Sequence, residues 1–285
     1  MERVSSVPPS YSQALQSASP QDDQALPLYR DVAPPSYSDG APTDPTTSPY
    51  RPFPAVMNGY YSMAGIKTLF LCGASRDERL FFVKLHMGLG VKAPLGARNG
   101  LLLRNGTSSK DAVIAAAGDD LPLAARVHAP DKPTTIVHLP PLEPRANTRG
   151  MDTEVMRAGP AGDDVVFLFS VEVGERQQRE RFEWREIKKR GDDAAKPGGF
   201  RLVQVSNRRK GTTASTSCCG AASDAEVLAL LLWSPGLSKM THPFSLQLQG
   251  RAMSMGSRWS LTVVATALRL WELYIQSKVG QARLR

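Results

Sequence analysis

Cysteine is scarce in this sequence. Only three cysteines are present among 285 residues, and two of them, Cys218 and Cys219, are adjacent. Adjacent cysteines rarely bridge each other, and Cys72 stands alone in an expected strand. The sequence therefore predicts no disulfide framework and favours a reducing compartment.

Long hydrophobic runs are also missing. The first 30 residues have no apolar core, so no signal peptide is expected. The longest apolar stretch, residues 260–275, is short for a bilayer span and contains Arg269 and Glu272. We therefore expect no transmembrane helix. Residue 2 is Glu2, so the N-terminal glycine that myristoylation requires is missing.

Recognisable catalytic and metal-binding patterns are absent as well. None of the four histidines lies in a HExxH or HxH arrangement, and no Cys/His spacing indicates zinc. The sequence contains no GxSxG, Walker A or GxGxxG motif. The aspartate pairs at 119–120, 163–164 and 192–193 lie beside glycine, which is typical of turns. We expect no catalytic residues, no metal and no cofactor, and we predict that the protein is not an enzyme.

Lysine is missing from residues 1–60, where proline and tyrosine concentrate. This segment holds eleven of the 22 prolines and five of the seven tyrosines, with three arginines and six acidic residues. Its net charge of −3 leaves +11 for the remaining residues, since the whole chain carries +8. The composition predicts a disordered, acidic arm ahead of a basic body, and basic charge favours a membrane surface or nucleic acid as partner.

The arm contains the same four-residue motif twice. Pro-Pro-Ser-Tyr occurs at residues 8–11 and again at residues 34–37. Paired prolines favour an extended polyproline II turn, which docks in the aromatic groove of a WW domain while the tyrosine fills a pocket. The predicted WW-binding residues are Pro8, Pro9, Tyr11, Pro34, Pro35 and Tyr37.

The body reads as short strands with a few helices. Apolar or alternating segments predict strands at 66–73, 79–89, 134–139, 164–173, 181–187, 199–206 and 243–249. Alanine-rich 108–118 and Ser-capped 223–233 predict helices, and the segment from Trp259 starts β-like and turns helical toward Tyr274. We predict an α+β fold with mostly antiparallel sheets and a few short helices.

The expected domain organisation has three parts. Residues 1–60 form the arm, and residues 61–145 and 160–285 form the two parts of the β-rich body, which are either one domain or two. Residues 143–163 read as a loop or long connection between the two parts.

Basic clusters follow three consecutive expected strands. If these strands form a meander, the first and third clusters lie at one edge of the sheet and the second lies at the opposite edge. Each basic residue beside an anionic membrane contributes about 1 kcal/mol, although solvated loop tips explain the clusters equally well. The candidate membrane- or nucleic-acid-binding residues are Arg176, Arg179, Arg181, Lys188, Lys189, Arg208, Arg209 and Lys210.

The arm and the basic body together resemble the matrix proteins of non-segmented negative-strand RNA viruses, filovirus-like or rhabdovirus-like. The resemblance lies in the two Pro-Pro-x-Tyr motifs and in the general size and charge layout. It implies a budding factor that recruits host HECT ubiquitin ligases of the Nedd4 type, binds anionic lipids of the inner membrane leaflet and self-assembles. It also implies a location in the virion, in the host cytoplasm and at the inner face of the plasma membrane, with viral nucleocapsid or RNA as a further partner.

Three other classes remain open. A cellular adaptor for WW-domain ligases usually carries its motifs near the C-terminus, whereas here they lie near the N-terminus. A retroviral Gag fragment favours a helical matrix domain. An RNA-binding protein favours aromatic and basic residues interleaved on a strand, and only Phe182, Trp184 and Arg185 approach that pattern.

Overall fold

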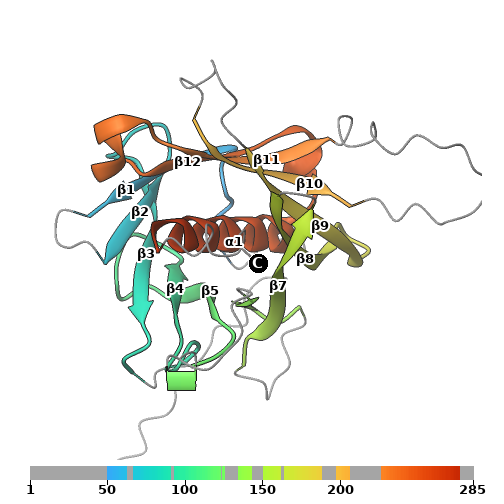
Figure 1. Cartoon of the computed structure of the whole chain (residues 1–285), viewed down its shortest axis with the longest axis horizontal. Helices are drawn as coiled ribbons and strands as arrows, with labels where there is room; N and C mark the ends of the chain where they lie inside the picture. The colour runs from blue at the N-terminus through green and yellow to red at the C-terminus, as the bar shows by residue number, and fades with distance from the viewer. Residues whose placement is uncertain are drawn as a thin grey trace, which may run out of the picture. The chain divides into compact units, whose positions relative to one another are not determined.

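Twelve β-strands close into a barrel around one α-helix in the computed structural model (Figure 1). The structure describes residues 50–62, 67–90, 93–122, 124–125, 134–142, 150–161, 164–187, 197–205 and 226–276. Within this part of the chain, each strand pairs antiparallel with its neighbours along the sequence, and β1 pairs with β12 to complete the ring.

The strands are short and evenly distributed along the body. The first six are β1 (Val56–Tyr61), β2 (Thr68–Cys72), β3 (Arg79–Met87), β4 (Asn99–Arg104), β5 (Val113–Asp119) and β6 (Thr134–Leu139). The second six are β7 (Asp152–Ala161), β8 (Asp164–Val173), β9 (Gln178–Ile187), β10 (Gly199–Gln204), β11 (Val227–Trp233) and β12 (Phe244–Leu248). Two 3₁₀ helices, η4 (Gly236–Met240) and η5 (Gly250–Ser254), flank β12.

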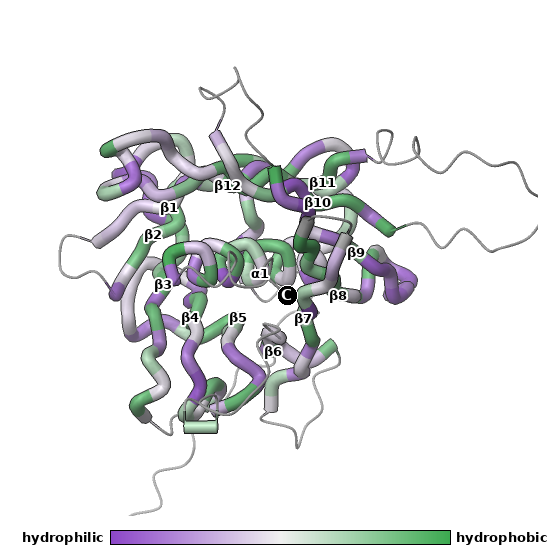
Figure 2. Tube along the Cα trace, viewed as in Figure 1, coloured by the Kyte–Doolittle hydropathy of each residue, from purple (hydrophilic) through white to green (hydrophobic). Residues whose placement is uncertain are grey.

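The helix α1 (Ser257–Ile275) occupies the inside of the barrel. A ring of this many strands leaves a lumen that strand side chains alone do not fill. Hydrophobic positions run along α1 within the ring of strands (Figure 2), and all of its residues from Leu261 to Leu273 are buried. Phe244 and Tyr61 pack their rings against Trp271, while Trp184 donates a hydrogen bond to Thr266 Oγ1 at 3.1 Å.

The alternation of strand direction gives the barrel two distinct ends. Odd-numbered strands begin at the end where α1 also begins, which we call the N-terminal rim. Even-numbered strands begin at the other end, where α1 finishes, which we call the C-terminal rim. At 1.5 Å per residue, the 19 residues of α1 form a helix about 28 Å long.

The predicted α+β fold is wrong. The antiparallel pairing was predicted correctly, but the strands form one closed barrel instead of sheets with several short helices. Strands of both predicted parts of the body belong to this one barrel. Tyr50 and Phe53 are buried in its core and β1 begins at Val56, so the folded body starts before residue 60.

The helix predicted at residues 108–118 is wrong, since β5 occupies most of it. Alanine favours helix only weakly, and tertiary pairing overrides that preference. β5 pairs with both β4 and β6. Ala115 and Ala117 are fully buried in the core that α1 shares, and their small side chains leave room for the helix.

The helix predicted at residues 223–233 is also wrong, because β11 lies there. Ala229, Leu231 and Trp233 are buried while Leu230 and Leu232 are only partly buried, which is the alternation of a strand. The outward positions are leucines too, so the alternation is hidden in the sequence. Ser223, the predicted cap, lies outside the described residues.

The C-terminal segment does not begin as a strand. Residues from Ser257 onward are helical, including the β-branched run around Val263 and Val264. Because this helix is enclosed by the barrel, burial outweighs the modest cost of β-branched residues. Among the described residues, no helix is both long enough and apolar enough to cross a membrane.

Residues 143–163 are not simply a connection. β7 takes up Asp152–Ala161 and pairs with β6 and β8, even though it contains Gly159 and Pro160. Pro160 lies beside the strand end, where it breaks only the last part of the ladder. The strands with alternating or continuous apolar patterns are confirmed, and Phe182, Trp184, Phe244 and Leu246 are all buried as predicted.

Candidate functional site

The predicted WW-binding residues, Pro8 to Tyr11 and Pro34 to Tyr37, lie outside the described residues. Lys188, Lys189, Arg208, Arg209 and Lys210 lie outside them as well. The predicted meander itself is confirmed, since β9 pairs with both β8 and β10.

The first basic cluster lies at the N-terminal rim, on the β8–β9 hairpin. Arg176 and Arg181 are exposed. The Val205 amide donates to the Arg181 carbonyl at 2.9 Å, which places the end of β10 beside this cluster. Arg179 is different, because its guanidinium is engaged by Glu154 on β7 and by Glu172 on β8. The hydrogen bond to Glu154 raises the pKa of Arg179 above its usual value. Arg179 is thus part of an ion cluster, while Arg176 and Arg181 have the exposure that a surface contact requires.

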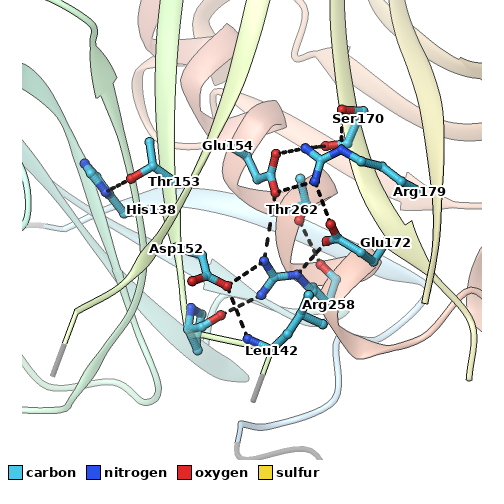
Figure 3. Close-up of polar contacts among 11 residues, drawn as sticks. His138, Leu142, Asp152, Thr153, Glu154, Ser170, Glu172, Arg179, Arg258 and Thr262 are labelled. Carbon is cyan, nitrogen blue, oxygen red and sulfur yellow. Dashed lines mark hydrogen bonds and ion pairs between the residues drawn. The ribbon is translucent and has the colours of Figure 1, made fainter. Parts of the chain in front are cut away.

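This ion cluster fixes the beginning of α1 to the barrel wall (Figure 3). Arg258, in the first turn of α1, contacts Glu172 at 3.0 Å and Asp152 at 3.2 Å. It also donates to the Pro140 carbonyl at 2.6 Å. Glu172 links the two arginines, since its other oxygen accepts from Arg179 at 2.6 Å. The two guanidinium groups therefore pair with all three carboxylates. These ion pairs connect the helix to strands β7, β8 and β9.

A second arginine fixes the far end of α1. Arg269 is fully buried and contacts Asp119 at the end of β5 and Glu272 one turn along the helix, the latter at 2.7 Å. Its Nε also donates to Thr135 Oγ1 at 3.3 Å. Burial lowers the pKa of Arg269, but the charges of Glu272 and Asp119 outweigh that effect and the net result is a raised pKa.

Sequence reasoning missed both of these clusters. In the sequence, Arg269 and Glu272 argue against a membrane span. An arginine three residues before a glutamate in an otherwise apolar stretch is also a signal of a buried ion pair. Asp119 lies 150 positions away, and nothing in the sequence alone indicates that it is the partner.

Cys72 is the one cysteine that the described residues include. It lines a small hollow of about 240 Å³ on β1, β2 and β3, together with Tyr60, Tyr61, Ser62, Phe70, Arg76 and Arg79. Burial raises the pKa of its thiol to about 11, despite the opposing charges of Arg79 and Arg76. A thiol with this pKa is protonated at neutral pH and a poor nucleophile. In the described part of the chain, no group of three or more Cys, His or acidic residues is arranged to hold a metal ion.

The most exposed large apolar side chains of the described residues lie at the C-terminal rim. Leu237 and Met240, in η4 between β11 and β12, have 86% and 76% of their surface exposed, and Leu89 after β3 has 84%. Soluble proteins tolerate single exposed apolar residues, but several at one end of a domain indicate an interaction surface. Three exposed lysines, Lys67, Lys84 and Lys239, lie on or near the same rim.

Comparison with known proteins adds no assignment. No protein family, curated protein or solved structure matches this chain. The resemblance to viral matrix proteins therefore stays a prediction from the arm motifs and the charge layout.

Proposed function

We propose that this protein recruits WW-domain ubiquitin ligases of the Nedd4 type to an anionic membrane, and that it does so by binding and not by catalysis. The observation that carries the proposal is the repeated Pro-Pro-Ser-Tyr of the arm, at residues 8–11 and 34–37. Both copies contain every residue that a WW groove reads, within a proline-rich segment that has no need of a fold to be recognised.

The spacing of the copies supports tandem recognition. A flexible chain of the length between them has an average end-to-end distance of roughly 25–30 Å. Once one copy is bound, the other is held near a second WW module at high local concentration, so the two weak contacts add up to a stronger one. Ligases with several WW modules are therefore the favoured partners.

The barrel supports a scaffold role. Arg258 and Arg269 tie α1 to the wall near both ends, and the described chain begins at Tyr50, which is packed into the core. The Arg51 amide donates to Asn105 Oδ1 at 3.1 Å, at the N-terminal rim. The folded body therefore begins at that rim, at Tyr50 and Arg51.

The proposal has a narrower form in which the protein is a viral matrix protein that drives assembly and budding, as a homo-oligomer in the virion. Its broader form is a cellular adaptor. In the described part of the chain every strand is paired on both sides, so self-assembly would use the rims or the outer faces of strands. Expression of the chain alone separates the two forms: a matrix protein sheds membrane-wrapped particles, whereas an adaptor binds WW modules without shedding them.

Calorimetry with purified full-length chain and a tandem WW fragment of a Nedd4-type ligase tests the proposal. Tyr11→Ala and Tyr37→Ala should each weaken binding by about tenfold or more, and the double variant should abolish it. Tyr29→Ala is the comparison variant, because Leu26 to Tyr29 form a weaker Leu-Pro-x-Tyr version of the motif, and it should weaken binding much less than either of the other two. Binding that survives in the double variant would overturn the proposal.

A further inference from the structure

We propose that the C-terminal rim of the barrel is the surface that enters an anionic lipid membrane. Leu237 and Met240 of η4 would insert among the lipids while Lys239, Lys67 and Lys84 contact the headgroups. This inference rests on the membrane part of the proposed function, and it assigns membrane contact to one surface of the barrel. It places membrane contact on residues other than the basic clusters predicted from the sequence.

Hydrogen bonds and a ring contact fix the turn that carries the exposed apolar residues of η4. No residue of η4 is buried, yet the Tyr61 amide donates to the Thr241 carbonyl at 3.0 Å directly after it. The His242 ring stacks on Tyr60 with centroids 4.7 Å apart. The His242 amide donates to the Ser238 carbonyl at 2.7 Å, closing the turn. Leu237 and Met240 are therefore held out from the barrel by a fixed backbone.

Exposed large apolar residues are distributed unequally between the rims. The described residues include ten of them, and seven lie at the C-terminal rim. These seven come from four separate segments of the chain: Met87 and Leu89, Leu121, Leu237 and Met240, and Tyr274 and Ile275. The N-terminal rim has Val56, Leu142 and Met253.

The two rims also differ in their charged residues. Lys67 and Lys239 are exposed at the C-terminal rim, and the exposed Lys84 lies beside it, across the ladder from Thr68. The carboxylates of Asp119 and Glu272 at that rim are buried against Arg269, and Asp120 and Glu186 of the same rim are partly buried. The N-terminal rim carries both signs at its surface, for example Arg251 paired with Glu226 at 2.9 Å.

A lipid surface fits this arrangement better than a protein partner. A stable protein interface needs a continuous packed area of about 800 Å² on each partner. Here the apolar side chains come from separate segments of the chain, and exposed lysines lie on or near the same rim. A bilayer interface adapts to such projections, and lysine places its apolar stem beside lipid and its ammonium group at the headgroups.

This orientation also suits ligase recruitment. The C-terminal rim would face the bilayer, and the residues that join the arm to the barrel, Tyr50 and Arg51, lie at the other rim. The attachment point of the WW-binding arm would therefore lie on the cytosolic side of the barrel.

Vesicle flotation with the full-length chain tests the inference, using phosphatidylcholine vesicles with and without phosphatidylserine. The double variant Leu237→Glu with Met240→Glu should bind phosphatidylserine vesicles about 100-fold more weakly, because two apolar insertions are lost and two negative charges are added. The matched control is Leu142→Glu with Met253→Glu, which makes the same charge change at the N-terminal rim and should bind within about twofold of the parent. All four side chains are at least partly exposed, so both variants should keep the thermal midpoint of the parent.

A second measurement reports insertion directly. In a background with Cys218→Ser and Cys219→Ser, Leu237→Cys carrying an environment-sensitive dye should show a blue shift on vesicles, and Met253→Cys with the same dye should not. Equal binding by the parent and by the C-terminal-rim variant would overturn the rim assignment alone. Absence of vesicle binding by the parent would overturn the membrane part of the proposed function too. It would not affect the WW-binding part, which the calorimetry tests separately. A parent dimer that the variant dissociates would identify the rim as a contact between copies and would also overturn the inference.

Discussion

The Arg269 guanidinium and the Asp119 carboxylate form an ion pair in the interior of the barrel, although 150 positions separate them in the sequence. Arg269 is completely shielded from solvent and Asp119 almost so. Glu272 provides a second carboxylate, and Thr135 provides a hydroxyl on the neighbouring strand. The pair joins the last third of the enclosed helix to the strand wall, so it links the two components of the fold.

Removing the positive charge of this pair should be strongly destabilising. Arg269→Met removes the cation that contacts both buried carboxylates, and we expect the free energy of unfolding to fall by about 3–5 kcal/mol. Urea unfolding followed by tryptophan fluorescence measures it. The triple variant Arg269→Met, Asp119→Asn and Glu272→Gln removes all the charges together and should recover much of the loss. A single variant as stable as the parent would show that the pair does not hold the helix.

The two arginines of the N-terminal rim should differ in importance. Arg258 has 13% of its side chain exposed and reaches Glu172, Asp152 and the Pro140 carbonyl. Arg258→Ala should lower stability by about 2–3 kcal/mol. Arg179 shares Glu172 but is 49% exposed, so Arg179→Ala should cost about 0–1 kcal/mol. The same unfolding assay compares them, and equal losses would contradict the anchoring role of Arg258.

A glycine at the β10–β11 pairing should resist substitution. A Cβ atom on Gly199 would overlap the Leu231 carbonyl oxygen across the ladder. Because that oxygen belongs to backbone in a closed sheet, Gly199→Ala should destabilise the barrel by about 2 kcal/mol or more. Gly90 has open space around its Cβ position, so Gly90→Ala serves as the control and should be neutral. Matching thermal midpoints for the two variants would rule out close packing at Gly199.

The Cys72 thiol should react slowly in the folded protein. Its pKa is raised to about 11, so at pH 8 only about one thiol in a thousand is ionised. In a Cys218→Ser and Cys219→Ser background, iodoacetamide labelling should be slow at pH 8 and should accelerate as the pH rises toward 11. Denaturant should restore the reactivity of an ordinary cysteine. Rapid labelling of the folded chain at neutral pH would contradict the burial of Cys72.

The strands that sequence reasoning identified were those with an alternating or a continuous apolar pattern. Phe244, Leu246 and Leu248 alternate with polar residues on β12, and Phe182 and Trp184 share one face of β9. β11 was missed because Leu230 and Leu232 make its outer face apolar too. β5 was missed because the alanines that leave space for α1 are also good helix formers.

Closure of the barrel could not be predicted from any local pattern. The pairing of β1 with β12 depends on contacts such as Met57 with Leu246, at opposite ends of the body. The C-terminal rim has the same origin, since Leu89 and Leu237 come to one end only because the strands alternate in direction around a closed ring. The Pro-Pro-x-Tyr motifs of the arm, in contrast, can be identified from the sequence itself, because the WW binding that we propose for them requires no fold.

Co-flotation of a tandem WW fragment with phosphatidylserine vesicles tests the central claim most directly. The fragment should float with the vesicles only when the full-length protein is present. The double variant Tyr11→Ala with Tyr37→Ala should stay on the vesicles but no longer carry the fragment with it. The double variant Leu237→Glu with Met240→Glu should leave the vesicles together with the fragment, as a complex. A WW fragment that stays in solution beside vesicle-bound parent protein would contradict the recruitment that we propose.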